Sequence, residues 1–365
     1  MNDDDKNLVR AKPIAVADKA YCLWGRDLEK ENIRYLTGLD AGYFHYVGKI
    51  NKAHLYCEDR VEGQRAATAI RVAYHQGLET FFALLFATLQ SPWCVLGWMQ
   101  VYAPGELRRI VRAVDPATVK GTEQKKQSHA HRKKIAPYTA LKERHLIYWD
   151  YIAQTIYKYL DFEPEEKRRT QELFASRWSK FAADFTKDEL VSEHNSIKHG
   201  FRVNLGGLVL YVGLQPASGE RPDPEEMHQL TGSEHGSSFF TPRTILESYE
   251  QMGKAAKNRE THFGIKRQQV NWDAEKLCDS LDILSASINN VRDFALLACG
   301  YDRHKLQVEV PVDSSFEGAS QASKKEALWS TQADIVVPGI NEADYGDIDA
   351  EMRRHIARLR ADLDP

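Results

Sequence analysis

Long stretches in which apolar residues recur every three or four positions are the feature that most constrains this fold. The first runs from Glu62 to Leu89 and ends at Ser91-Pro92, because the residue before a proline is disfavoured in helical backbone. Four more stretches have the same period and predict helices over about 141–160, 165–185, 187–199 and 271–299. A single helix cannot bury such a stripe, so the sequence predicts that these helices form one bundle.

Strand patterns are short and lie between or after the helices. Residues 207–214 predict a strand, 217–238 a loop rich in Gly, Pro and charge, and 306–310 a second strand. The expected fold class is therefore mainly α, a helical bundle with a small peripheral β insertion. The chain is divided into three parts: an N-terminal appendage (1–60), a helical domain (61–300), and a C-terminal strand, polar linker and charged helix (301–365).

Composition limits the classes of function. A net charge of −3 excludes a protein that coats nucleic acid by bulk positive charge. The five cysteines are scattered without a CxxC pair, which predicts free thiols in a reducing compartment. The acidic start does not have the pattern of a secretory signal, and the longest apolar stretch, 78–99, is interrupted by Glu79 and Pro92. We therefore expect a cytoplasmic location without membrane contact.

Most of the candidate chemistry lies in the segment Glu193-His-Asn-Ser-Ile-Lys-His-Gly-Phe-Arg202, since the standard nucleotide, zincin and nucleophile-elbow signatures are missing. On a helix, Asn195, His199 and Arg202 share one face with Lys198 beside them, while His194 lies on the apolar face that would anchor the helix. An imidazole titrating near neutral pH can take a proton from a ribose 2′-hydroxyl, and two cations can stabilise a phosphate. The alternative is a merely solvated polar face, which residue types alone favour.

A family resemblance shifts this balance. The segment Asn195-Ser-Ile-Lys-His-Gly-Phe201, preceded by the helix Tyr74-His-Gln-Gly-Leu-Glu-Thr-Phe-Phe-Ala-Leu-Leu-Phe86, resembles the helical HEPN superfamily. Many HEPN-like proteins have an early long helix with a glutamate in an apolar run and a late helix with Asn-x-x-Lys-His-Gly. The resemblance implies a HEPN-like bundle and a metal-independent endoribonuclease, without cofactor, in a toxin or antiviral-defence setting. It also implies a homodimer in which two motifs meet.

The sequence departs from that family at one point. Active members carry an arginine separated from the histidine by four to six positions, where this chain has Ser192, Glu193 and His194. Lys198 or Arg202 would have to substitute for it. The resemblance therefore also fits a catalytically inactive module that binds RNA or a protein partner.

Glu79 and a basic segment are secondary candidates. A carboxylate among apolar residues needs a partner, either His75 one turn earlier or Lys198 or His199 from the later helix, unless it sits at the edge of the stripe. The segment 120–134 holds the candidate RNA-binding residues Lys125, Lys126, Arg132, Lys133 and Lys134. Its alternative is a flexible solvated loop.

Metal binding has weak support in the sequence. His129 and His131 alternate as metal ligands can, but no nearby Cys, Asp or third His completes a set. A metal-dependent hydrolase that uses the scattered histidines is therefore the third and weakest class of function, and we expect no metal site.

Overall fold

The computed structural model describes residues 12–16, 19–23, 26–114, 149–212, 227–244, 262–306, 308–311, 313–320, 325–336 and 354. By their contacts, the residues of the chain fall into two compact units. Unit 1 comprises Met1–Ser238 and Val270–Leu328, and unit 2 comprises Phe239–Gln269 and Trp329–Pro365.

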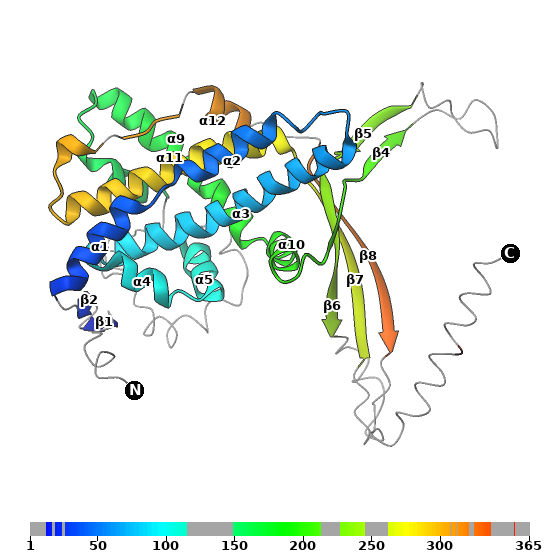
Figure 1. Cartoon of the computed structure of the whole chain (residues 1–365), viewed down its shortest axis with the longest axis horizontal. Coiled ribbons are helices and arrows are strands. Elements are labelled where there is room, and N and C mark those ends of the chain that lie inside the picture. The colour runs from blue at the N-terminus through cyan, green and yellow to red at the C-terminus, as the bar shows by residue number, and fades with distance from the viewer. Residues whose placement is uncertain are drawn as a thin grey trace, which may run out of the picture. The chain divides into compact units, whose positions relative to one another are not determined.

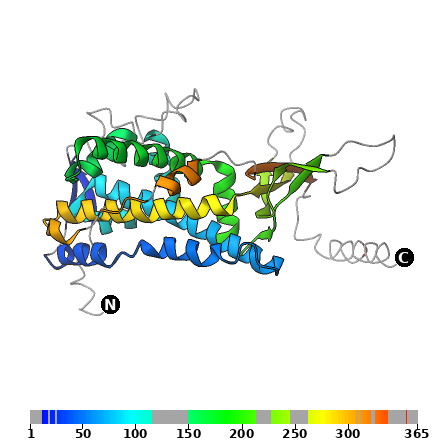
Figure 2. The same cartoon turned by 90° about the horizontal axis from the view of Figure 1, so that it is seen from above.

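The core of unit 1 is built on two long helices, α3 (Arg60–Gln90) and α11 (Ala274–Ala298), which pack along one another and against α2 (Gly42–Lys52) (Figure 1; Figure 2). The side chain of Asp59 caps α3 by accepting hydrogen bonds from the backbone of Val61 and Glu62. Asp273 caps α11 in the same way. These caps fix where each helix begins.

The remaining helices cover this pair. They are α8 (Trp149–Ile156), α9 (Pro164–Thr186) and α10 (Asp188–Lys198), with the shorter α1 (Arg26–Gly38), α4 (Val95–Val101), α5 (Pro104–Val114) and α12 (Asp313–Ser320). Aromatic rings of α3 and α9 fill the space between them. The Phe81 ring lies 5.4 Å from that of Trp178, centroid to centroid, and both side chains are fully buried. The expected bundle is confirmed: α3, α8, α9, α10 and α11 all belong to unit 1.

The strands of the described residues form three sheets. The largest has the order β3-β6-β7-β8, from Val203–Leu205, Gly236–Thr244, His262–Asn271 and Ala327–Val336. Each of the last three strands has residues in both units. Two antiparallel pairs complete the set: β1 (Lys12–Val16) with β2 (Lys19–Leu23), and β4 (Val209–Val212) with β5 (His228–Gly232).

Several expectations need correction. The loop predicted over 217–238 contains β5 and the start of β6, and the strand predicted over 306–310 is irregular at its described positions. The expected polar linker contains α12 and the start of β8. Residues 1–60 are not a separate appendage in the described part, because α1 and α2 pack on α11. Residues 141–148, and all of the predicted C-terminal helix except residue 354, lie outside the described residues.

The cysteines differ in part from the expected free thiols. Cys57, Cys278 and Cys299 form no disulfide, whereas Cys94 is disulfide-bonded. Within the described residues, no single helix is long and apolar enough to cross a membrane. Helix α3 and the segment Pro92–Gln100 meet the criteria only together, as a pair bent by 119°.

Replacing Phe81 by alanine should lower the free energy of unfolding by about 3 to 5 kcal/mol, because it removes a fully buried ring and leaves a cavity between α3 and α9. Urea denaturation followed by circular dichroism measures this loss. Trp93→Ala is the control, since the Trp93 side chain is 57% exposed and should matter by less than about 1 kcal/mol. Equal losses in the two variants would contradict the packing described here.

Candidate functional site

A row of polar side chains runs along the contact between α3 and α10. Helix α3 contributes Arg71, His75 and Glu79, which are four residues apart and therefore point to one side of the helix. Helix α10 contributes Glu193, His194 and Lys198. We call these six residues the α3–α10 polar row. It passes from the buried interior at Arg71 to the surface at Lys198.

The inner end of the row is a buried ion pair. Arg71 donates from Nε and Nη2 to Oε2 of Glu193, at 3.1 and 2.7 Å, and the Ser237 hydroxyl donates to the other carboxylate oxygen at 2.8 Å. The Arg71 guanidinium also lies 5.3 Å from the centre of the Trp272 ring and 5.9 Å from that of Tyr74. Both members of the pair are almost completely removed from solvent. Both oxygens of Glu193 are therefore occupied by the fold.

His75 lies beside this pair, and its burial is the main reason that it stays neutral. Its Nε2 is 3.5 Å from the Glu193 carboxylate, too far for a good hydrogen bond. Burial and the neighbouring Arg71 lower the pKa of His75 to about 4, although Glu193 acts in the opposite direction. Burial alone would raise the pKa of Glu193, but Arg71 and His75 outweigh it and hold that pKa at about 2. At neutral pH the inner end therefore contains Arg⁺, Glu⁻ and a neutral imidazole.

The outer end of the row is more open. The His194 ring lies 4.9 Å from that of His75, and its Nε2 is 3.8 Å from Glu79 Oε2. Lys198 Nζ is also 3.8 Å from that oxygen. At these distances the contacts are electrostatic rather than hydrogen-bonded. His194 holds the pKa of Glu79 below its usual range. Partial burial of Glu79 acts in the opposite direction, and Lys198 lowers the pKa further. Lys198 was one of the partners expected for Glu79, and it is a partner in the structure. His75, the candidate on the same helix, lies beside Glu193 instead.

The end of α10 differs from the predicted helix in one important respect. The helix ends at Lys198, and Gly200 and Phe201 adopt positive φ angles of 104° and 52°. The Arg202 amide then bonds back to the carbonyl oxygen of Ser196 at 2.7 Å. The chain therefore turns away from the helix axis after His199. The expectation that Arg202 continues the helical face of Asn195 and His199 is wrong, because that face ends before it.

The predicted catalytic residues are nevertheless all on the surface. Asn195, Lys198, His199 and Arg202 are exposed, and the side chain of His199 has no ion-pair or hydrogen-bond partner among the described residues. The family's arginine position is used differently, because Glu193 is locked to Arg71 and His194 lies between His75 and Glu79. The basic segment with Lys125, Lys126, Arg132, Lys133 and Lys134 lies outside the described residues.

Arg71 and Ser237 were not among the sequence candidates. Arg71 could have been found from the sequence, because it lies one helical turn before His75 and two turns before Glu79. These three polar residues therefore share one side of an otherwise apolar helix. Ser237 leaves no such signal, because its partner is 44 residues away. Within the described ranges, no group of three or more His, Cys, Asp or Glu residues is placed to hold a metal ion.

Comparison with known proteins found no matching family model, no matching curated protein and no matching solved structure. The HEPN-like interpretation therefore depends on the sequence motif alone.

Acidification should destabilise the protein in two steps. The unfolded chain binds a proton at His75 near pH 6.5, but the folded protein does so only near pH 4, so this part of the stability is lost as pH falls from 6.5 to 4. Glu193 has a depressed folded pKa, so its contribution is present above pH 4.5 and is lost as pH falls towards 2. Each step is worth on the order of 3 kcal/mol.

Urea unfolding between pH 3 and pH 8 tests this expectation. His75→Gln should flatten the dependence between pH 6.5 and pH 4, because glutamine does not titrate. His304→Gln is the control, since His304 is an exposed histidine outside the α3–α10 polar row. An unchanged slope in His75→Gln would show that His75 is not the group responsible.

Proposed function

We propose that this protein is a HEPN-like endoribonuclease that cleaves RNA without a metal ion at the exposed end of α10. One observation carries the proposal: the end of α10 exposes an amide, a cation and an imidazole at Asn195, Lys198 and His199, and a second cation, Arg202, is exposed three residues further along the chain. The buried Arg71–Glu193 pair joins this helix to α3. The toxin or antiviral-defence setting implied by the resemblance is part of the same proposal.

The proposed chemistry uses His199 as the base. A neutral imidazole takes the proton of a ribose 2′-hydroxyl, and the 2′-oxygen attacks the adjacent phosphorus. The bond from phosphorus to the 5′-oxygen breaks, which leaves a 2′,3′-cyclic phosphate and, after proton uptake, a 5′-hydroxyl. Asn195, one helical turn before His199, orients the imidazole or the substrate. Lys198 and Arg202 stabilise the negative charge on the phosphate.

The contact between Lys198 and Glu79 is compatible with this role. The Lys198 side chain is 50% exposed and Glu79 is 33% exposed, and the charged atoms are 3.8 Å apart. Ion pairs this open contribute only about 0 to 1 kcal/mol. Lys198 can therefore exchange Glu79 for an RNA phosphate at little cost.

A second candidate function is an inactive HEPN-like module that binds RNA or a protein. It is favoured by the contacts of Glu193 and His194, which stand where active family members carry their arginine. Glu193 is fully buried against Arg71, and His194 is packed against His75, so neither contacts a phosphate. Catalysis therefore depends on Lys198 and Arg202 doing what that arginine does.

The proposal includes a homodimer. Side chains of Tyr43, Tyr46 and Ile50 on α2 are exposed, and a groove of 340 Å³ between α2 and α3 is lined by Tyr43 and Phe201. Phe201 is two residues from His199, so a second copy seated on this surface would bring the two motifs near each other. His199 of one copy could then protonate the 5′-oxygen released by the other.

His199→Ala should reduce RNA cleavage by about a hundredfold or more, because it removes the proton acceptor. Cleavage of a labelled RNA pool is measured with and without EDTA, and the termini are identified by mass spectrometry. The expected wild-type result is EDTA-resistant cleavage with 2′,3′-cyclic phosphate ends. His304→Ala, also an exposed histidine, should leave the rate unchanged.

Three other results would redirect the proposal. Full activity in His199→Ala would eliminate this site, and loss of cleavage with EDTA would favour a metal-dependent hydrolase. Wild-type protein that binds RNA but does not cut it would favour the inactive module. Binding without cleavage is measured on the same RNA pool by filter retention.

Light scattering should give the mass of a dimer for the wild-type protein. Phe201→Ser and Tyr46→Ser should shift it towards the monomer, because each removes an exposed apolar side chain from the proposed interface. The control is Trp93→Ser, which removes an exposed aromatic ring outside that groove. A wild-type protein that stays monomeric at high concentration would contradict the dimer.

A further inference from the structure

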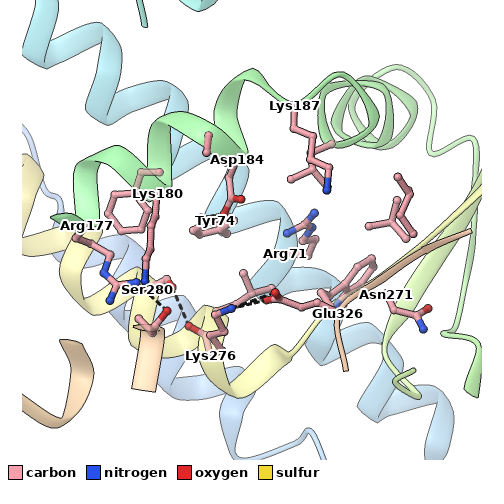
Figure 3. Close-up of a pocket in the computed structure, with 18 residues that line it drawn as sticks. Arg71, Tyr74, Arg177, Lys180, Asp184, Lys187, Asn271, Lys276, Ser280 and Glu326 are labelled. Carbon is pink, nitrogen blue, oxygen red and sulfur yellow. Dashed lines mark hydrogen bonds and ion pairs between the residues drawn. The ribbon is translucent and has the colours of Figure 1, made fainter. Parts of the chain in front are cut away.

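A second hollow lies within unit 1 and shares Arg71 with the α3–α10 polar row. It has a volume of 480 Å³ and is lined by residues of α3, α9 and α11 and by the adjoining ends of β7 and β8 (Figure 3). Its basic residues outnumber its acidic residues by five to two. The basic residues are Arg71, Arg177, Lys180, Lys187 and Lys276. We call this hollow the basic cavity.

The acidic residues of the cavity already have partners. Asp184 accepts a hydrogen bond from the Tyr74 hydroxyl at 2.6 Å, and Glu326 accepts two from Lys276 Nζ at 2.9 and 3.0 Å. Glu193 lies behind Arg71 and balances its charge. Even with all three carboxylates included, the positive charges are in excess. The cavity is therefore electrostatically suited to an anion.

Arg71 is the best oriented of these cations. Its Nε and Nη2 are committed to Glu193, and its guanidinium is held between the Trp272 and Tyr74 rings. Its Nη1 has no hydrogen-bond partner among the described residues. A buried, fixed guanidinium with one free nitrogen binds an anion without losing much side-chain freedom.

Two lysines complete the charged side of the cavity: Lys180 in α9, and Lys187, which directly follows the last residue of α9. In Figure 3 the side chain of Lys187 reaches towards Arg71, and Lys180 lies on the same side of the cavity as Arg177. Burial, then the cations Arg177 and Lys276, lower the pKa of Lys180, although Asp184 acts in the opposite direction. Lys180 therefore lies in a positive field, which a bound anion would relieve.

The rest of the cavity wall is apolar and aromatic. Tyr74, Phe181, Trp272, Leu190 and Leu277 line it. The volume lies in the range of about 300 to 1,000 Å³ that is typical of small-molecule sites. A single inorganic ion would leave most of this space and the apolar wall unused.

We infer that the basic cavity binds a nucleotide-sized organic phosphate, with the phosphates on Arg71, Lys180 and Lys187 and the organic part along the apolar wall. Neither part of this inference depends on RNA cleavage at His199. The ligand would share the guanidinium that anchors α10 through Glu193.

Isothermal titration calorimetry of the full chain tests the inference. The probes are the four ribonucleoside triphosphates, inorganic pyrophosphate and adenosine. At least one triphosphate should bind at least tenfold more tightly than pyrophosphate, adenosine should bind weakest, and affinity should fall with added salt. Equal affinity for pyrophosphate and every triphosphate would overturn the organic part of the inference. No heat with any phosphate at millimolar concentration would overturn all of it.

Charge-removing variants locate the site. Lys180→Gln and Lys187→Gln should each weaken triphosphate binding about tenfold, because each removes a charge-assisted contact. Lys187 is exposed, so its variant should fold, and circular dichroism checks both. Lys49→Gln removes an equal charge from the surface of α2 and should bind like the wild type. Unchanged affinity in both cavity variants would overturn the location.

Discussion

The buried pair of Arg71 and Glu193 is the interaction on which the rest of the site depends. It joins the middle of α3 to α10, and the Ser237 hydroxyl adds the start of β6 to the same carboxylate. A buried pair contributes little net stability compared with apolar residues of similar size, but removing one partner costs about 3 to 5 kcal/mol. The pair therefore matters mainly because it fixes which way α10 faces.

That orientation decides what α10 presents to solvent. Successive residues of a helix are rotated by about 100°, so a buried Glu193 turns Asn195 and His199 together towards the opposite side. Asn195 and His199 are exposed, as this geometry requires, and Glu193 is completely buried. The exposure of the proposed catalytic face and the burial of the carboxylate have one cause.

The helices were predictable from sequence and most of the sheet was not. The apolar stripes of α3, α9 and α11 are local signals, and they place these helices to within a few residues. Strand β5 (His228–Gly232) has no alternation of apolar and polar residues, so its pairing with β4 leaves no local pattern. Pairing with a strand that is distant in the sequence determines where such strands form.

The candidate site was predictable in composition but not in arrangement. The sequence indicated Asn195, Lys198, His199 and Arg202, yet it placed Arg202 on the helix although Gly200 offered a helix end. The positive φ angles at Gly200 and Phe201 separate Arg202 from the helical face. Periodicity also could not reveal that Arg71, rather than His75, is the main partner of the later helix.

Arg71 also connects the two sites by electrostatics. Its charge is one reason that the pKa of His75 is low, after burial itself, and its side chain lines the basic cavity. An anion bound to Arg71 in the cavity would offset part of this charge, so the Arg71 contribution to the lowered pKa of His75 would shrink. It would not compete with Glu193, which uses the other two nitrogens. Occupation of the cavity would therefore change the charge balance beside α10 while leaving the hydrogen bonds that anchor the helix in place.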